Sequence, residues 1–186
     1  MFWLVEKINT PSFGIKVGKC VILCAIMVKN HNLTQMIGFL GEYEVTIDAK
    51  GRFLLPAGFR KQLPEEWGNQ FVISRGIEPC LTLYPKKTWE PIFSEISQLN
   101  DFDPKVRQFQ RMFLNGATTI ELDTAGRILL PPNLKAYASL DKDAIMVAAV
   151  KKIEIWDKRK YQEFFENFSP EAFSQLAGEV MVKKDQ

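Results

Sequence analysis

The residues best suited to do chemistry are two arginines, each preceded by an aspartate four positions earlier. Residues 44–56 read EVTIDAKGRFLLP and residues 119–131 read TIELDTAGRILLP, at an offset of 75. The aspartate can accept hydrogen bonds from the backbone of a turn, and the glycine before each arginine can adopt a positive φ. Each arginine is therefore presented at a tight turn. Its guanidinium can bind a phosphate or a guanine edge, or pair with the aspartate and close the turn. The four residues are Asp48 with Arg52 and Asp123 with Arg127, and the two glycines are Gly51 and Gly126.

Further basic residues flank the first of these turns. Lys50 lies two positions before Arg52, and Arg60 and Lys61 follow on the next predicted element. Together they form the densest basic patch near either motif, which suits binding to an anionic polymer, although charge clusters are also commonly solvated. In the second copy Ala125 replaces Lys50, which favours a structural role for Arg127 over a contact with nucleic acid.

The sequence contains few residues suited to metal binding or catalysis. The only histidine is His31, and the three cysteines are Cys20, Cys24 and Cys80. This set lacks the ligand spacing of a zinc site, and an odd, sparse set of cysteines is typical of a reducing compartment. The sequence also lacks a Walker loop and the GxGxxG, HExxH and GxSxG motifs. We therefore expect no catalytic residue, no cofactor and no metal, and Cys80 is interpreted as a small buried side chain.

The elements that must position the arginines are the same in both copies. Each copy is predicted to run strand, turn, short strand, proline-led helix and two further strands, followed by a longer helix. The third and fourth strands are expected at 71–73 and 81–84 in the first copy, with counterparts at 145–147 and 153–156. Neither copy of about 45 residues can bury much core alone, so the two should pack together.

Between the copies, Asp103 and Pro104 are typical of a helix start, as N-cap and first residue. The helix after them is predicted to bury Val106, Phe109 and Phe113 along one face. The longer helices are expected at 86–97 and 157–168, the second with an aromatic stripe suited to a core or a subunit interface.

Length and charge bound the remaining possibilities. The chain has 186 residues, of which 46 % are hydrophobic and 25 % charged, which indicates one or two globular domains. The net charge is +2, but residues 1–35 carry four of the 24 basic and one of the 22 acidic residues. The remaining chain therefore has a net charge of −1. Net charge gives no support for a nucleic-acid partner, so any basic surface must be local.

Residues 1–35 are unlike the rest of the chain. Their apolar run, Cys20 to Val28, is too short to span a bilayer as a helix and lacks a following small-residue cleavage site. We interpret residues 1–35 as a disordered extension or the product of a mis-assigned start, with Met36 as the natural first residue.

The paired DAKGRFLLP and DTAGRILLP segments resemble the MraZ family of bacterial regulators, which carry two SpoVT-AbrB, or swapped-hairpin, domains. The resemblance extends from Met36 to about Met181. It implies a β-rich α+β fold in which two pseudo-symmetric halves interlock their strands around one core, with flanking helices. The expected segments are an extension at 1–35, repeats at 42–88 and 117–160, a connecting helical segment at 89–116, and a C-terminal helix and tail at 161–186.

The same resemblance implies a cytoplasmic, nucleoid-associated transcriptional regulator and not an enzyme. Its expected partners are double-stranded DNA, at tandem repeats upstream of its own operon, and further copies of itself in a ring-like homo-oligomer. No membrane or small-molecule substrate is expected. Lys50, Arg52, Arg60, Lys61 and Arg127 are the predicted DNA contacts, and Asp48, Gly51, Asp123 and Gly126 the residues that shape the loops. The alternative is a ring-forming scaffold that binds other proteins and no DNA.

Overall fold

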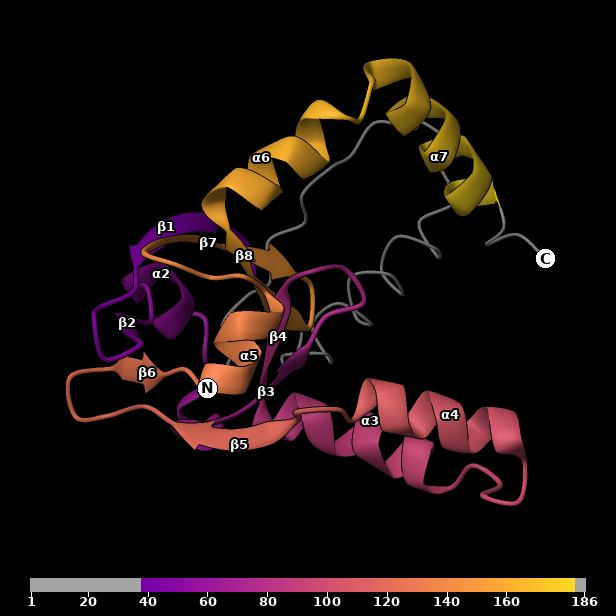
Figure 1. The fold of residues 1–186 in the computed structure, drawn as a ribbon, viewed down its shortest axis with the longest axis horizontal. Coiled ribbons are helices and arrows are strands. Elements are labelled where there is room, and N and C mark those ends of the chain that lie inside the picture. The colour runs from indigo at the N-terminus through magenta and orange to yellow at the C-terminus, as the bar shows by residue number, and fades with distance from the viewer. Residues whose placement is uncertain (1–37, 183–186) are drawn as a thin grey trace, which may run out of the picture. The chain divides into compact units, whose positions relative to one another are not determined.

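A computed structural model describes residues 38–182 of the chain (Figure 1). The described residues belong to one compact unit, which spans 36–186. The extension predicted at 1–35 therefore lies outside the described residues. Across 38–182, every helix is too short or too polar to cross a membrane.

The two sequence repeats fold into the same series of elements. The first contains β1 (Glu42–Thr46), β2 (Arg52–Leu54), α2 (Ala57–Arg60), the 3-10 helix η1 (Glu65–Trp67), β3 (Gln70–Arg75), β4 (Leu81–Pro85) and α3 (Lys86–Ser97). The second contains β5 (Thr118–Glu121), β6 (Arg127–Leu129), α5 (Pro132–Tyr137), β7 (Asp143–Ala149), β8 (Lys152–Asp157) and α6 (Lys158–Glu166). Helix α4 (Pro104–Phe113) joins the repeats, and α7 (Pro170–Val182) follows them.

The repeats interlock through a six-stranded antiparallel sheet with the order β1-β7-β8-β4-β3-β5. The first strand of each repeat pairs with the third strand of the other, β1 with β7 and β5 with β3. At the centre, β4 pairs with β8, and Thr82 lies opposite Glu154. This symmetric order confirms the predicted β-rich α+β fold of two interlocked halves.

The short strands β2 and β6 form a separate two-stranded ribbon on the same pseudo-two-fold axis. Phe53 lies opposite Ile128 at its centre, and both side chains are completely buried or nearly so. Because side chains alternate along a strand, the residues on either side of this pair face outward. The ribbon therefore has one face in the core and one face available for contact.

One hydrophobic core lies between the ribbon, the short helices and one face of the sheet. Phe59 of α2 and Leu134 of α5 occupy equivalent places in it, and both are inaccessible to solvent. Burying a side chain of this size contributes roughly 1.5–3 kcal/mol to folding. The prolines that precede these helices, Pro56 and Pro131, stand at the N-cap, one position earlier than a first helical residue.

The other face of the sheet is covered by longer helices. Trp89 of α3 packs on Tyr84 and stacks on Phe113 of α4, with ring centroids 5.8 Å apart. Helix α6 contacts the opposite half of this face through Phe164, which packs on Trp156. Its first turns are fixed to β1 by hydrogen bonds from Lys158 to Glu44 and from Tyr161 to Glu42.

Helix α4 begins as predicted, because the Asp103 side chain accepts a hydrogen bond from the Lys105 N–H group. Its apolar face differs from the prediction, since Phe109 remains 49 % exposed. The reason is that α4 packs on α3 through Phe113 instead of lying flat on the sheet.

Two predicted segment boundaries fall within helices. The connecting segment at 89–116 begins inside α3, which starts at Lys86. The C-terminal segment at 161–186 begins inside α6 and contains a second helix, α7.

Candidate nucleic-acid interface

The first DxxxR turn, loop 1, comprises residues 48–52 and joins β1 to β2. The Asp48 Oδ1 atom accepts hydrogen bonds of 2.9 Å from the backbone N–H groups of Lys50 and Arg52. The Asp48 N–H group donates in turn to the Arg52 carbonyl oxygen at 2.8 Å. Gly51 adopts a φ of +78°, a conformation that other L-residues enter only with strain. These contacts account for the aspartate and the glycine of the motif.

The arginine of loop 1 is anchored by the same aspartate. Arg52 Nε and Nη2 lie 2.9 and 2.8 Å from Asp48 Oδ2. The pKa of Asp48 is lowered to about 2, first by the backbone N–H of Arg52 and then by its side chain, with desolvation acting in the opposite direction. The guanidinium is thus held at the turn while its third nitrogen is left out of the pair.

Loop 2, residues 123–127 between β5 and β6, repeats this geometry. Asp123 Oδ1 accepts from the N–H groups of Ala125 and Arg127, and Arg127 Nε donates to Asp123 Oδ2 at 2.8 Å. Gly126 has the same φ as Gly51, +78°. The pKa of Asp123 is also lowered, first by the backbone N–H of Arg127 and then by its side chain. The ion pair between arginine and aspartate, which the sequence offers as one way to close the turn, is therefore present in both copies.

The ribbon ties the two loops together across the pseudo-two-fold axis. Leu55 N–H donates to the Gly126 carbonyl at 3.0 Å, and Leu130 N–H donates to the Gly51 carbonyl at 2.9 Å. The outward face of the ribbon carries both arginines and two exposed leucines. These residues pair across the strands as Arg52 with Leu129 and Leu54 with Arg127. The structure thus brings the two predicted arginines onto one surface.

The loops differ in what lies beside them. A Cβ atom placed on Gly126 would lie 2.8 Å from Arg60 Nη1, so the α2 arginine covers loop 2. A Cβ atom on Gly51 would meet only the Leu130 carbonyl oxygen, at 3.7 Å. Arg60 therefore lies against the turn of the other repeat, whereas its position in the sequence places it nearest loop 1. The strand exchange between repeats produces this placement, and no local sequence pattern signals it.

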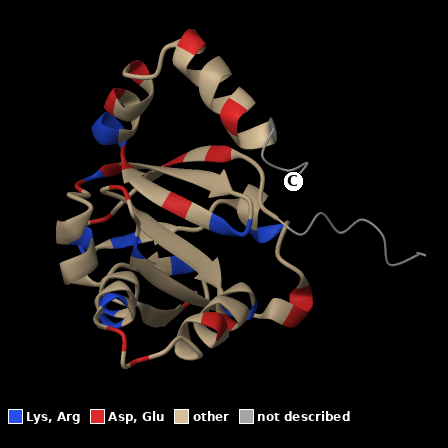
Figure 2. Cartoon of the chain, turned by 90° about the vertical axis from the view of Figure 1, so that its right-hand side faces the viewer, with Lys and Arg blue, Asp and Glu red and all other residues tan. Residues whose placement is uncertain are grey.

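The remaining predicted contacts are accessible. Lys50 is exposed at the tip of loop 1, and Lys61 is exposed at the C-cap of α2. Neither lysine has an ion-pair partner in the described range, 38–182. In Figure 2 basic and acidic segments are interspersed over the elements. Electrostatic attraction for DNA therefore depends on local groups of basic side chains and not on the net charge.

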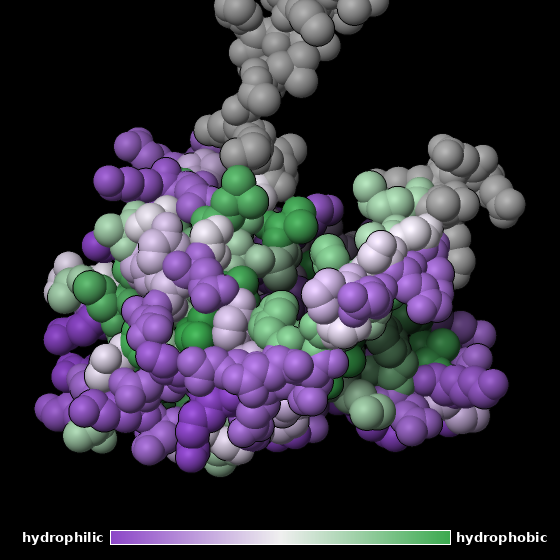
Figure 3. All heavy atoms as spheres, turned by 90° about the horizontal axis from the view of Figure 1, so that it is seen from above, coloured by the Kyte–Doolittle hydropathy of each residue, from purple (hydrophilic) through white to green (hydrophobic). Residues whose placement is uncertain are grey.

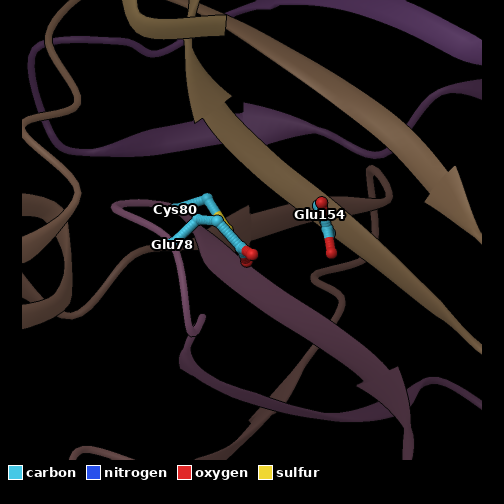
Figure 4. A group of neighbouring side chains, drawn as sticks. All are labelled: Glu78, Cys80 and Glu154. Carbon is cyan, nitrogen blue, oxygen red and sulfur yellow. The ribbon is translucent and has the colours of Figure 1, made fainter. Parts of the chain in front are cut away.

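Among residues 38–182, one cluster has a composition suited to metal binding: Glu78, Cys80 and Glu154 (Figure 4). Two of its three groups, Cys80 and Glu154, are already engaged in the structure. Cys80 is fully buried, and burial raises the pKa of its thiol to about 12. Glu154 accepts hydrogen bonds from Lys152 at 2.8 Å and from the Trp156 indole at 3.1 Å. A thiol that stays protonated and a carboxylate that already accepts two hydrogen bonds are poor metal ligands.

Comparison with known proteins identifies relatives along most of the chain. A family model described as "MraZ protein, putative antitoxin-like" matches twice, at residues 38–112 and 113–183. A protein of Christiangramia forsetii named transcriptional regulator MraZ is 40 % identical over 151 residues, which cover 81 % of this chain and 97 % of the relative. A protein of the same name from Cytophaga hutchinsonii is 43 % identical over 144 residues, which cover 77 % of this chain and 95 % of the relative.

A third relative of the same name, from Thermomicrobium roseum, is 46 % identical over 123 residues, covering 66 % of this chain and 84 % of the relative. The relatives are named as regulators, which supports the expectation that the chain is not an enzyme. Two family matches in tandem, two interlocked structural repeats and relatives of this similarity lead to one conclusion: the chain belongs to the MraZ family.

Proposed function

We propose that this protein is a transcriptional regulator that binds double-stranded DNA at tandem repeats upstream of its own operon. It acts as a ring-like homo-oligomer in the cytoplasm, in association with the nucleoid. The names of its relatives support the regulatory role. The observation that carries the DNA-binding proposal is the outward face of the β2–β6 ribbon with its two anchored arginines.

A two-stranded ribbon fits the major groove, where an arginine recognises guanine through two hydrogen bonds. Asp48 holds the Arg52 guanidinium in place, so less side-chain freedom is lost when DNA binds. The same pairing offsets the charge of the arginine. Attraction for the DNA phosphates therefore depends on lysines and arginines that have no acidic partner. Lys50 supplies such a charge at loop 1, and Arg60 supplies one beside loop 2.

A single subunit of nearly neutral charge is expected to bind DNA weakly. Several loops presented to repeated sites would gain avidity without any new contact. Exposed apolar side chains on α6, on α7 and between them supply surface for self-association: Phe164, Phe165, Phe168, Phe173, Leu176, Val180 and Met181. Figure 3 shows hydrophobic side chains at the surface among the hydrophilic ones. Patches of this kind in a protein of ordinary composition mark interaction sites.

The proposal is tested by fluorescence anisotropy of the full chain with duplex DNA from directly upstream of its own gene. A scrambled duplex and two salt concentrations provide the comparison. The variant Lys50→Ala is compared with Lys87→Ala, which removes another exposed lysine, one that pairs with Glu90 on α3. We expect preference for the native duplex and weaker binding at high salt. Lys50→Ala should weaken DNA binding and reduce the slope of log affinity against log salt concentration by about one. Lys87→Ala should change neither quantity.

Equal and negligible binding of both duplexes by an oligomeric protein would overturn the proposal. The result would favour the protein-interaction scaffold, in which the arginine–aspartate pairs only close turns. If a monomeric form bound one repeat as tightly as the oligomer binds several, the avidity argument would be wrong.

A further inference from the structure

A cavity of about 380 Å³ opens at one end of the central sheet, where β3 extends beyond its neighbour β5. Its walls come from the ends of β3 and β4, from α4 and from the last residue of α5. Most of the lining is apolar, provided chiefly by Tyr84, Phe109, Met112, Phe113 and Tyr137. This size and composition are those of small-molecule sites in proteins.

The cavity contains one cation without a counter-charge. Arg75 lines it, and its Nε atom is buried without a hydrogen-bond partner. The guanidinium carbon lies 4.7 Å from the centre of the Tyr137 ring, and Arg75 forms no ion pair within residues 38–182. Leaving a buried donor of a charged group without a partner destabilises the folded state. An anion seated in the cavity would supply the guanidinium with the counter-charge that it lacks.

The nearby polar groups do not compete for that anion. Lys152 is at the wall, but its Nζ atom pairs with Glu154 at 2.8 Å. The hydroxyl groups of Ser74 and Thr82 are hydrogen-bonded to each other at 2.8 Å. Arg75 is therefore the cation in this cavity with unused capacity for an anionic head, and the Asn115 amide and the Tyr84 hydroxyl add uncharged donors at the wall.

The pseudo-symmetric half of the molecule is built differently at the same place. Strand register puts Ala148 where Arg75 stands, and Gln62 corresponds to Tyr137. There the Gln62 side chain is bonded to both the N–H and the carbonyl of Leu40, and the preceding Phe39 fills the core. The cation and the space are thus features of one half alone and do not follow from the repeated fold.

We propose that this cavity binds a small amphipathic anion, a carboxylate or sulfonate with an apolar body. The anionic head pairs with Arg75, and the apolar body lies along Phe109, Met112 and Phe113. Exposed fractions of 49 % for Phe109 and 69 % for Met112 leave apolar area for such a body to cover. This site is separate from the β2–β6 ribbon, so its ligand does not depend on the proposed DNA contacts.

The test uses two dyes that share an apolar body. The first, 8-anilinonaphthalene-1-sulfonate, carries an anionic group, whereas N-phenyl-1-naphthylamine is neutral. Fluorescence titrations of the full chain are compared with Arg75→Met and with Arg111→Met, which removes an exposed arginine of α4 outside the cavity. We expect Arg75→Met to weaken binding of the anionic dye at least tenfold. Binding of the neutral dye should be unchanged, which also shows that the variant remains folded, and Arg111→Met should bind both dyes normally.

A second measurement does not depend on any variant. Octanoate should displace the anionic dye from the unmodified protein at a concentration at least tenfold lower than octanol does. Equal displacement by the two compounds, or equal loss of the anionic dye in both arginine variants, would overturn the proposal. Absence of dye binding by the oligomer would also overturn it, because a neighbouring subunit would then occupy the cavity.

Discussion

Loops 1 and 2 have the same turn and different surroundings. In each, an aspartate accepts two backbone N–H groups and holds an arginine, and a glycine with a φ of +78° completes the turn. Loop 1 carries Lys50 and is open above Gly51, whereas loop 2 has Ala125 and is covered by Arg60. The motif therefore defines the shape of a turn, and the residues around it decide which surface it offers to a partner.

The largest expected effect concerns what the loops share. Phe53 and Ile128 face each other in the core beneath them, with exposed fractions of 1 % and 0 %. Phe53→Ala should lower the free energy of unfolding by about 3–5 kcal/mol and Ile128→Ala by about 2–5 kcal/mol. Denaturant unfolding measures both, with the outward Leu54→Ala and Leu129→Ala as controls. A small loss at only one core position would show that the halves are not equivalent.

Smaller losses are expected from the glycines, since alanine at a φ of +78° is strained. Gly51→Ala and Gly126→Ala should each lower the free energy of unfolding by roughly 1–2 kcal/mol. The alanine at position 126 also displaces the Arg60 guanidinium, which is flexible enough to move at little cost. Urea titrations should therefore give similar values. A distinctly larger loss at 126 would mean that Arg60 is firmly held over loop 2.

The ionised carboxylates of Asp48 and Asp123 should both stabilise the folded protein, and this contribution should be lost in acid. Their pKa values are lowered on folding, Asp48 to about 2, so each contributes stability that is present above the unfolded value of 3.8. For Asp48 that contribution disappears as the pH falls towards 2, because protonation removes the acceptor. NMR titration of the two carboxyl groups checks this directly, and Asp48→Asn should lose this part of the acid dependence. A normal midpoint at either site would mean that the hydrogen bonds of its turn, from the arginine backbone first and then from its side chain, are absent in solution.

The smallest expected effect is a gain. Ala125→Lys gives loop 2 the lysine that loop 1 carries at Lys50. One more phosphate contact should steepen the salt dependence of DNA affinity, on a double-logarithmic plot, by about 0.9. Anisotropy at several salt concentrations measures this slope, with Thr124→Lys as a neighbouring control. An equal change from both lysines would indicate general electrostatic attraction and no defined contact at loop 2.

Much of the fold could be predicted because local signals agree with it. The repeat, the turns at Gly51 and Gly126 and the helix start at Asp103 each follow from residue types at fixed spacing. The pairing of each arginine with its aspartate was one of two interpretations that the spacing allowed. The exchange of strands came from the resemblance to a family, since periodicity does not indicate which strand pairs with which.

The features that could not be predicted depend on that exchange. Arg60 lies over loop 2 because the two repeats meet at the β2–β6 ribbon, whereas the sequence places it nearest loop 1. Phe109 has the spacing of a buried residue, yet α4 rests on α3 and leaves it over a cavity. Arg75 carries no motif, and only the three-dimensional structure shows that its cation lacks a partner.

The most direct test of the difference between the loops compares Arg52→Met with Arg127→Met. Both variants remove an arginine that is ion-paired with an aspartate in the same turn, so their thermal unfolding should change alike. Anisotropy with duplex DNA from upstream of the gene then reports the contact itself. Loss of a bidentate base contact is worth about 1–3 kcal/mol. Arg52→Met should therefore weaken binding roughly fivefold or more, and Arg127→Met by much less. Equal losses, or a greater loss at Arg127, would contradict the assignment of loop 1 as the principal DNA contact.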